Sequence, residues 1–145
     1  MTIWKSTPSL EQLNSLNHGT IHSTLGLQFV GIGEDYLEAT LPVDERTRQP
    51  MGLLHGGASA VLAESLGSVA SLLVTNELDH PKVICVGIEL NLSHLKSVRD
   101  GTIRGRATPV RLGKTLHVWE IVIRDEKQGQ EVCRSRLTVL VRENA

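Results

Sequence analysis

The stretch ASAVLAESLGSVASLLVT, residues 58–75, constrains the fold more than any other part of the sequence. It contains no proline, and small residues are scattered among its large apolar ones, so we predict one long helix. Because this helix is apolar on nearly every side, we expect it to lie buried inside the protein. Glu64 and five serine or threonine positions argue against a membrane span.

Alternating apolar runs on both sides of this helix predict β-strands. Two strands, 25–32 and 36–43, are joined at Gly33–Asp35 and precede the helix. Three or four longer strands follow it, over 82–94, 101–112, 114–125 and 130–141. A short helix is predicted over 9–17, a turn over 20–25, and polar loops over 44–49 and 76–81. Two strands, one helix and then a meander of strands indicate an α+β fold, with an antiparallel sheet and the helix on one face. We expect one domain over 1–145.

Composition excludes several classes of protein. The formal net charge of -1 argues against nonspecific nucleic-acid binding, which needs a basic face. Cys85 and Cys133 both fall in predicted strands and suggest buried inert thiols, so we expect no disulfide framework and a reducing, cytoplasmic location. The six histidines are scattered, without a HExxH or CxxC pattern, and we expect no metal and no separate cofactor. A core with 40% apolar residues often gains burial by oligomerising.

Glu64 is the most unusual residue of the predicted helix. A carboxylate that is buried without a partner is costly, and proteins keep one mainly where it faces a cavity or takes part in chemistry. The alternative is that Glu64 pairs with a cation or points to solvent. Ser68 lies four residues further on, so both side chains should project from the same face of the helix. Ser68 could bind a water or the carboxylate, or simply allow close packing.

The residues at the start of the helix form a second candidate feature, His55-Gly56-Gly57. A helix N-terminus has free N–H groups and a partial positive charge, which stabilise the oxyanion of a tetrahedral thioester intermediate. The glycines would let a substrate approach the backbone closely; the alternative is that they only cap the helix. Gln49 could donate its amide to a thioester carbonyl, or it could be a solvated loop residue.

The stretch QPMGLLHGGASAVLAESLGSVA, residues 49–70, closely resembles the signature of the hotdog-fold thioesterase superfamily. It is most similar to the branch that contains the arthrobacter-type 4-hydroxybenzoyl-CoA thioesterase, the enterobactin proofreading thioesterase and 1,4-dihydroxy-2-naphthoyl-CoA hydrolase. Further similarity lies in LEATLPVDERTRQP, VGIELNLSHLKSVRDG and RSRLTV, so that it covers essentially the whole chain. The resemblance implies hydrolysis of an acyl-CoA thioester, with coenzyme A as part of the substrate, by a homo-oligomer built as a dimer of dimers.

The resemblance also implies a role for each candidate residue. Glu64 would be the nucleophile or the general base, and the Gly56 N–H would polarise the thioester carbonyl. Gln49 and His55 would orient the thioester, and Ser68 would place the water or an aromatic ring. The active site would lie between subunits, with Glu64 from one chain and Gln49 and Gly56 from the other.

Binding residues follow from the same resemblance. Positions that match coenzyme A contacts are Gly87, His94, Leu95, Lys96, Ser97, Arg111, Leu112, Gly113, Lys114, Thr115 and Leu116, and the acyl pocket would include Met51 and Val69. Lys96 stands where relatives carry arginine, and lysine lacks the bidentate fork of a guanidinium. Lys96, Arg111 and Lys114 supply positive charge for phosphates, although the same residues also suit a solvated strand edge.

Two other functions remain open from the sequence. A hotdog enoyl-CoA hydratase or dehydratase would act on the acyl chain, but its HFPG-like segment is absent. A noncatalytic acyl-CoA binding protein would have little reason to keep Glu64 beside its ligand. An aromatic acyl-CoA, such as a hydroxybenzoyl or 1,4-dihydroxy-2-naphthoyl thioester, is the expected substrate, ahead of phenylacetyl and medium-chain thioesters.

Overall fold

The computed structural model describes residues 1–78 and 80–143, so Asp79 in the predicted 76–81 loop and the last two residues of the predicted 1–145 domain lie outside it. Two short helices come first, α1 (Leu10–Ser15) and α2 (Ile21–Leu25). The strands are β1 (Gln28–Ile32), β2 (Leu37–Pro42), β3 (Val83–His94), β4 (Thr102–Leu112), β5 (Leu116–Asp125) and β6 (Glu131–Glu143), and the long helix is α3 (Gly56–Thr75). The predicted order of elements is confirmed.

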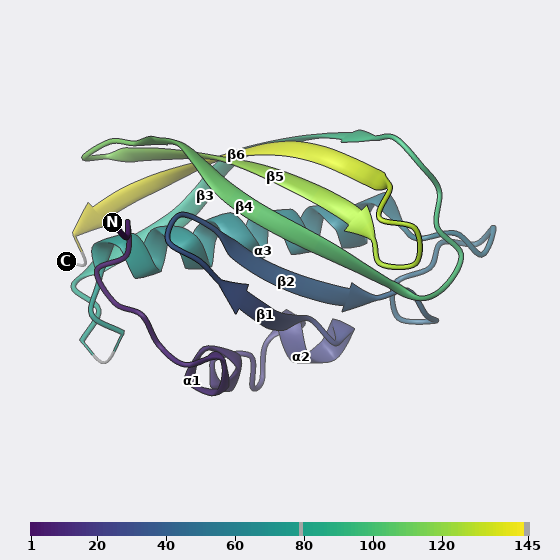
Figure 1. Cartoon of the computed structure of the whole chain (residues 1–145), viewed down its shortest axis with the longest axis horizontal. Helices are drawn as coiled ribbons and strands as arrows, with labels where there is room; N and C mark the ends of the chain where they lie inside the picture. The colour runs from purple at the N-terminus through teal and green to yellow at the C-terminus, as the bar shows by residue number, and fades with distance from the viewer. Residues whose placement is uncertain (79, 144–145) are drawn as a thin grey trace.

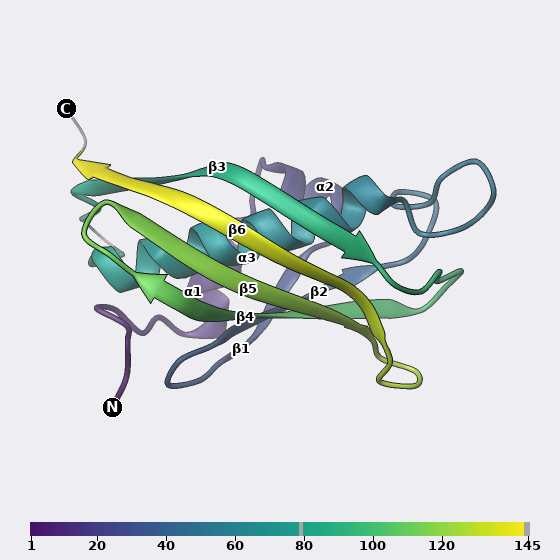
Figure 2. The ribbon, with the colours of Figure 1, turned by 90° about the horizontal axis from the view of Figure 1, so that it is seen from above.

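The described strands form one antiparallel sheet in the order β1-β2-β4-β5-β6-β3, which curves around α3 (Figure 1). Figure 2 shows β5 and β6 crossing over the helix. A sheet wrapped around one long helix is the hotdog architecture, so the predicted fold class is confirmed. The predicted meander is wrong at β3, which pairs with β6 and lies at the far edge of the sheet. Alternation along a strand fixes which side chains face the core, but it does not specify the neighbouring strand.

The start of the first strand also differs from the prediction. Leu25, predicted to open the strand, instead ends α2, and Gly26 caps that helix with a φ of 79°. The chain then enters β1 at Gln28. The predicted connection at 33–35 is confirmed as a tight hairpin, in which the Gly33 N–H donates to the Tyr36 carbonyl at 2.9 Å.

Small residues let α3 approach the sheet closely. Leu62, Leu66 and Leu73 are fully buried on the side of α3 that packs against the strands. A Cβ atom built at Gly105 would lie 2.7 Å from Cδ1 of Leu66, and one built at Gly67 would lie 2.5 Å from Cδ2 of Leu137. Close packing at these contacts therefore requires glycine.

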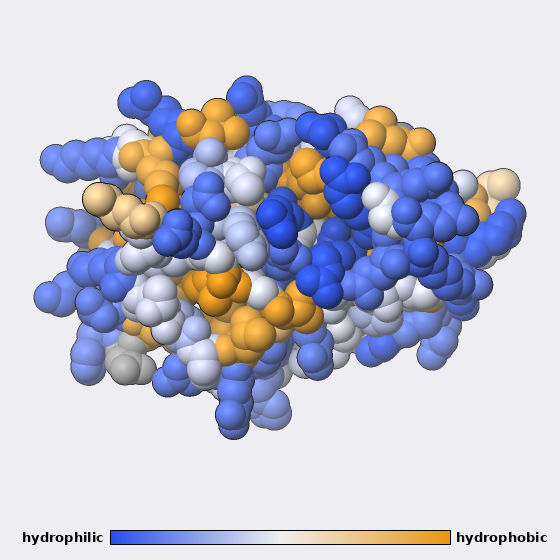
Figure 3. Space-filling view, viewed as in Figure 1, coloured by the Kyte–Doolittle hydropathy of each residue, from blue (hydrophilic) through white to orange (hydrophobic). Residues whose placement is uncertain are grey.

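The sequence predicts a helix that is buried on nearly every side, but in the structure one face of α3 remains accessible. Glu64 is exposed in the single chain, and Val61, Ser65 and Val69 are only partly buried. By length and composition α3 could cross a membrane, but half of it is buried inside this protein, as expected of a core helix. On the face seen in Figure 3, exposed apolar side chains form separate patches within a largely hydrophilic surface.

Candidate functional site

His55 caps the N-terminus of α3 with its side chain. The Gly57 N–H donates to Nδ1 of His55 at 2.7 Å, while Ala58 donates to the His55 carbonyl at 2.9 Å. A ring nitrogen that accepts carries no proton, so the proton of neutral His55 lies on Nε2. His55 therefore presents an N–H donor beside the start of the helix.

Gly56, the first residue of α3, lies directly against His94 at the end of β3. A Cβ atom at position 56 would approach Nε2 of His94 to 2.8 Å, so a larger residue would have to displace the ring. Within residues 1–78 and 80–143, no hydrogen bond from the Gly56 N–H is found. This N–H lies at the positive end of a 20-residue helix and can donate to a ligand.

Gln49 is held in the loop before α3. Its backbone N–H donates to the Leu53 carbonyl at 2.7 Å, and its side-chain oxygen accepts from the Met51 N–H. Because the amide oxygen is occupied, the NH₂ group is the part of the Gln49 side chain that remains to donate to a ligand.

These groups line one cavity of about 390 Å³, which we call the Gly56 cavity. It gathers six of the predicted residues: Gln49, Gly56, His94, Leu95, Lys96 and Ser97. Leu53, Leu54, Ser59 and Val132 complete its wall. Predicted thioester-binding and coenzyme A-binding residues thus meet at the N-terminus of α3.

Lys96 is not a free cation within this chain. Its Nζ lies 3.2 Å from Asp125 and 3.1 Å from the amide oxygen of Gln128. Two groups hold the pKa of Asp125 below its usual value: the backbone N–H of Gln128, which has the larger effect, and the Lys96 ammonium. A phosphate at Lys96 would therefore have to compete with an existing carboxylate partner.

Glu64 lies in a different cavity, of about 320 Å³, which we call the Glu64 cavity. The predicted residues Ser68 and Val69 line the same cavity, together with Ile21, His22, Val61 and Ser65. The expected burial of Glu64 is wrong for the single chain, because α3 buries only the face against the sheet. Gly87 of β3 lies beneath the carboxylate: a Cβ there would overlap Oε1 of Glu64 and lie 3.2 Å from its Cδ.

One chain does not bring Glu64 to Gly56. The two residues are eight positions apart on one helix, which is about 12 Å along its axis, and they line separate cavities. A thioester held at the Gly56 N–H of one chain is therefore out of reach of the same chain's carboxylate.

The remaining predicted binding residues are separated from the Gly56 cavity. Arg111, Leu112, Gly113, Lys114, Thr115 and Leu116 form the β4–β5 turn and the strand ends beside it. Pairing through β6 aligns Leu116 with Val86, eight residues before His94, which is roughly 25 Å along an extended strand. The turn therefore lies at the opposite end of the sheet from His94 (Figure 1). Met51 is 76% exposed in the loop before α3.

Sequence reasoning missed two residues that border Glu64. Ser65 adjoins it on α3, and the ring of His22 bonds to the Ser65 hydroxyl at 2.9 Å. Adjacency to Glu64 could have drawn attention to Ser65. His22 is 43 residues from Ser65, and no local pattern links them.

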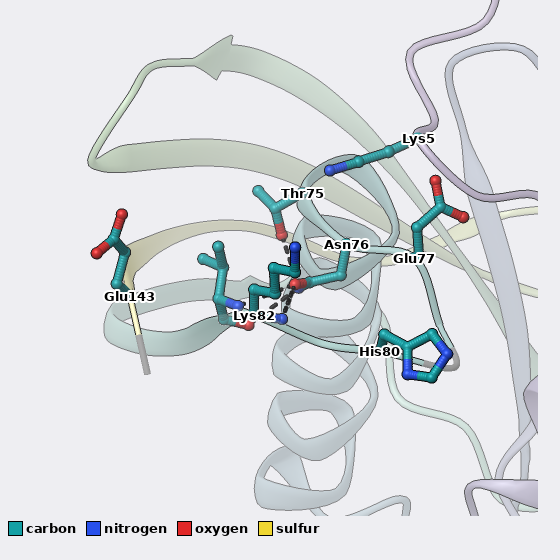
Figure 4. A pocket seen from close by; sticks show the side chains of 8 residues that line it. Lys5, Thr75, Asn76, Glu77, His80, Lys82 and Glu143 are labelled. Carbon is teal, nitrogen blue, oxygen red and sulfur yellow. Dashed lines mark hydrogen bonds between the residues drawn. The ribbon is translucent and has the colours of Figure 1, made fainter. Parts of the chain in front are cut away.

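A larger cavity than these two, of about 770 Å³, is lined by none of the predicted site residues. It lies at the C-terminal end of α3, where Lys5, Glu77, His80, Lys82 and Glu143 surround it with mixed charge (Figure 4). Asn76 there is engaged with the backbone of 82 and 83. Among the described residues, no group of three His, Cys, Asp or Glu side chains is placed to hold a metal ion.

Comparison with known proteins identifies the family. Residues 51–132 match the model of the thioesterase superfamily. The chain is 51% identical over 139 residues to 1,4-dihydroxy-2-naphthoyl-CoA hydrolase of Escherichia coli K12, which covers 96% of this chain and 98% of that protein. The chain belongs to the thioesterase superfamily. A proofreading thioesterase of Cronobacter turicensis is 49% identical, with coverage of 96% and 98%.

Solved thioesterases share the architecture as well. A thioesterase from Haemophilus influenzae superposes with a TM-score of 0.92 at 45% identity, covering 98% of this chain and 96% of that one. A mutant thioesterase from Pseudomonas aeruginosa gives a TM-score of 0.93 at 43% identity, covering 99% and 100%. This thioesterase superfamily member therefore matches its relatives over nearly its whole length.

Proposed function

We propose that this thioesterase hydrolyses an aromatic acyl-CoA, with 1,4-dihydroxy-2-naphthoyl-CoA and hydroxybenzoyl-CoA as the first candidates. The observation that carries the proposal is the pair of groups on α3: the Gly56 N–H, which has no hydrogen-bond partner among the described residues, and, two turns later, the accessible carboxylate of Glu64. The similarity to a naphthoyl-CoA hydrolase supports the choice of an aromatic acyl group.

The chemistry follows from these two groups. The thioester carbonyl would accept from the Gly56 N–H and the Gln49 amide, which stabilise negative charge as it develops on oxygen. Glu64 would attack the carbonyl carbon, or would take a proton from the water that attacks it. On the first route the C–S bond breaks to leave an anhydride between the acyl group and Glu64, which water then hydrolyses to the acid and the free carboxylate. On the second route the oxygen of the attacking water enters the acid as the C–S bond breaks. On either route the water that is consumed supplies the proton with which coenzyme A leaves as the thiol. His55, with its proton on Nε2, would orient the acyl group.

The proposal requires two chains, because Glu64 and Gly56 of one chain line separate cavities. Edge strand β3 exposes Val86 and Ile88, at 49% and 55%. Its outer edge pairs with no strand among the described residues and suits pairing with a second copy. Antiparallel pairing of two β3 strands would set the start of one beside the end of the other. It would thereby bring the β4–β5 turn of one protomer towards His94 of its partner. We propose a dimer of this kind, two of which form a tetramer in the cytoplasm.

A panel of acyl-CoA thioesters, followed by thiol release, tests the proposal. We expect the highest kcat/KM for aromatic acyl groups and lower values for medium-chain groups. Glu64→Gln should lower kcat by about two to four orders of magnitude. The unfolding midpoint should change little, because glutamine has nearly the size and shape of glutamate. Absence of thiol release from every thioester, or full activity of Glu64→Gln, would contradict the proposal. An altered enoyl absorbance without thiol release would instead indicate a hydratase.

A further inference from the structure

Three polar side chains from separate segments form a hydrogen-bonded series at the wall of the Glu64 cavity. Nδ1 of His22, on α2, lies 2.9 Å from Oδ1 of Asn17, and Nε2 lies 2.9 Å from Oγ of Ser65 on α3. His22 is partly buried and its ring also meets Phe29 edge-on. We call this series the Asn17–His22–Ser65 chain.

The direction of each hydrogen bond in the Asn17–His22–Ser65 chain follows from which of its atoms can donate and which can accept. The NH₂ group of Asn17 donates to the Leu27 carbonyl at 3.0 Å and to Asn14 at 3.2 Å, so the Asn17 oxygen faces His22 and can only accept. Nδ1 of His22 therefore carries the proton. Burial lowers the pKa of His22, which keeps the ring neutral near pH 7, and Nε2 is then an acceptor. It follows that the Ser65 hydroxyl donates to Nε2.

This arrangement limits what Ser65 can offer to a ligand. A serine hydroxyl has one proton and two lone pairs, and the proton of Ser65 is committed to His22. Towards the cavity its oxygen therefore acts only as an acceptor. The cavity is otherwise lined by the apolar side chains of Ile21, Val61 and Val69 and by the polar groups of Glu64 and Ser68. The Glu64 carboxylate is the acceptor that the proposed chemistry uses, and Ser65 adds a second acceptor, fixed by His22, to a partly apolar wall. Such an acceptor is suited to selecting a ligand by one donor group.

We propose that Ser65, held in this state by His22, accepts a hydrogen bond from a hydroxyl group on the acyl part of the substrate. The inference rests on the proposed thioesterase function and specifies its substrate class: hydroxylated aromatic acyl-CoA thioesters rather than their unsubstituted analogues. Ser65 acts here in specificity and takes no part in breaking the thioester bond.

Matched thioester pairs test this role. The ratio of kcat/KM for 2-, 3- and 4-hydroxybenzoyl-CoA to that for benzoyl-CoA measures the preference for a hydroxyl, and 1-hydroxy-2-naphthoyl-CoA against 2-naphthoyl-CoA extends it to the larger ring. We expect at least one hydroxylated thioester to be preferred by the wild type. Ser65→Ala should lower that ratio about 2- to 10-fold, the value of one neutral hydrogen bond, while the unsubstituted thioesters keep their kcat/KM.

Two further variants separate recognition from folding. Ser65→Thr keeps the hydroxyl and should keep the preference. Ser23→Ala is a matched control, because the Ser23 hydroxyl donates to the Thr20 carbonyl at 3.0 Å and does not line the cavity; its ratio should equal that of the wild type. An unchanged ratio in Ser65→Ala, or an equal fall for hydroxylated and unsubstituted thioesters, would overturn the inference.

The two proposals fail in different ways. A wild-type enzyme that hydrolyses every thioester with no preference for a hydroxyl would overturn the role of Ser65 and leave the hydrolase function standing. A wild type that releases no thiol from any of them would overturn the proposed function, and the role of Ser65 with it.

Discussion

Gly87→Ala should impair catalysis while leaving the fold intact. A Cβ at this position overlaps Oε1 of Glu64, and since non-bonded atoms prefer separations of about 3.5 Å, the carboxylate oxygen must retreat by about 1 Å. Misplacement on this scale can cost about 100-fold in rate, so we expect kcat/KM to fall about 10- to 100-fold. The atom that moves is the end of an exposed, flexible side chain, so the loss of stability should be small.

Gly67→Ala is the matched control for this prediction. Its Cβ would lie 2.5 Å from Cδ2 of Leu137, whereas that of Gly87→Ala would lie 3.2 Å from Cδ1 of the same leucine. Gly67→Ala should therefore lower the unfolding midpoint and keep kcat/KM per folded molecule. Thiol release and thermal denaturation of both variants provide the comparison. Wild-type kcat/KM in Gly87→Ala would refute the placement of the carboxylate above β3.

Three further outcomes concern stability. Ser71→Ala removes the hydroxyl that lies 2.7 Å from Nε1 of Trp119 and 3.0 Å from Nδ1 of His117, all within the core. Urea denaturation should show that the free energy of unfolding falls by about 1–3 kcal/mol. A fall near zero would show that water replaces the hydroxyl. Leu66→Ala should cost about 2–5 kcal/mol by the same measurement, and a smaller cost would mean that the sheet collapses onto the cavity. Burial lowers the pKa of His22 and His117, so below pH 6.5 the unfolded chain binds more protons than the folded one, and the free energy of unfolding should fall as the pH drops from 7.5 to 5.5. A free energy that stays constant or rises over this range would contradict the neutral state of both rings.

The sequence predicts those features of the fold that are locally encoded. The short helix predicted over 9–17 is present as α1, which a capping box of Ser9 and Gln12 begins, and a left-handed glycine, Gly129, forms the turn before β6. The continuous apolar stretch identifies α3, although the helix begins at Gly56 rather than at the predicted Ala58 because His55 caps it. Features that depend on which elements meet in space are less accessible. The edge position of β3 is one, since its alternation would be the same beside any strand.

In the candidate site, too, the sequence predicts local features better than those that depend on which elements meet in space. The cost of burying a carboxylate singles out Glu64 in the sequence, yet its side chain is exposed in the described part of the chain. His94 joins Gly56 because its ring packs against the glycine, whereas the turn with Arg111 lies at the other end of the sheet. His22 was missed because its partners are at positions 17 and 65, and only the fold brings the three together.

Subunit complementation tests the central claim most directly, that Glu64 of one protomer acts on a thioester held at the N-terminus of α3 in its partner. Glu64→Ala and Gln49→Ala chains, each weakly active alone, would be denatured, mixed in equal amounts and refolded together. Half of the dimers should be mixed, and each of these would have one fully wild-type site, so we expect about one quarter of the wild-type rate of thiol release. A mixture no more active than the average of the two variants would show that both residues serve the same chain's site, and would contradict the account.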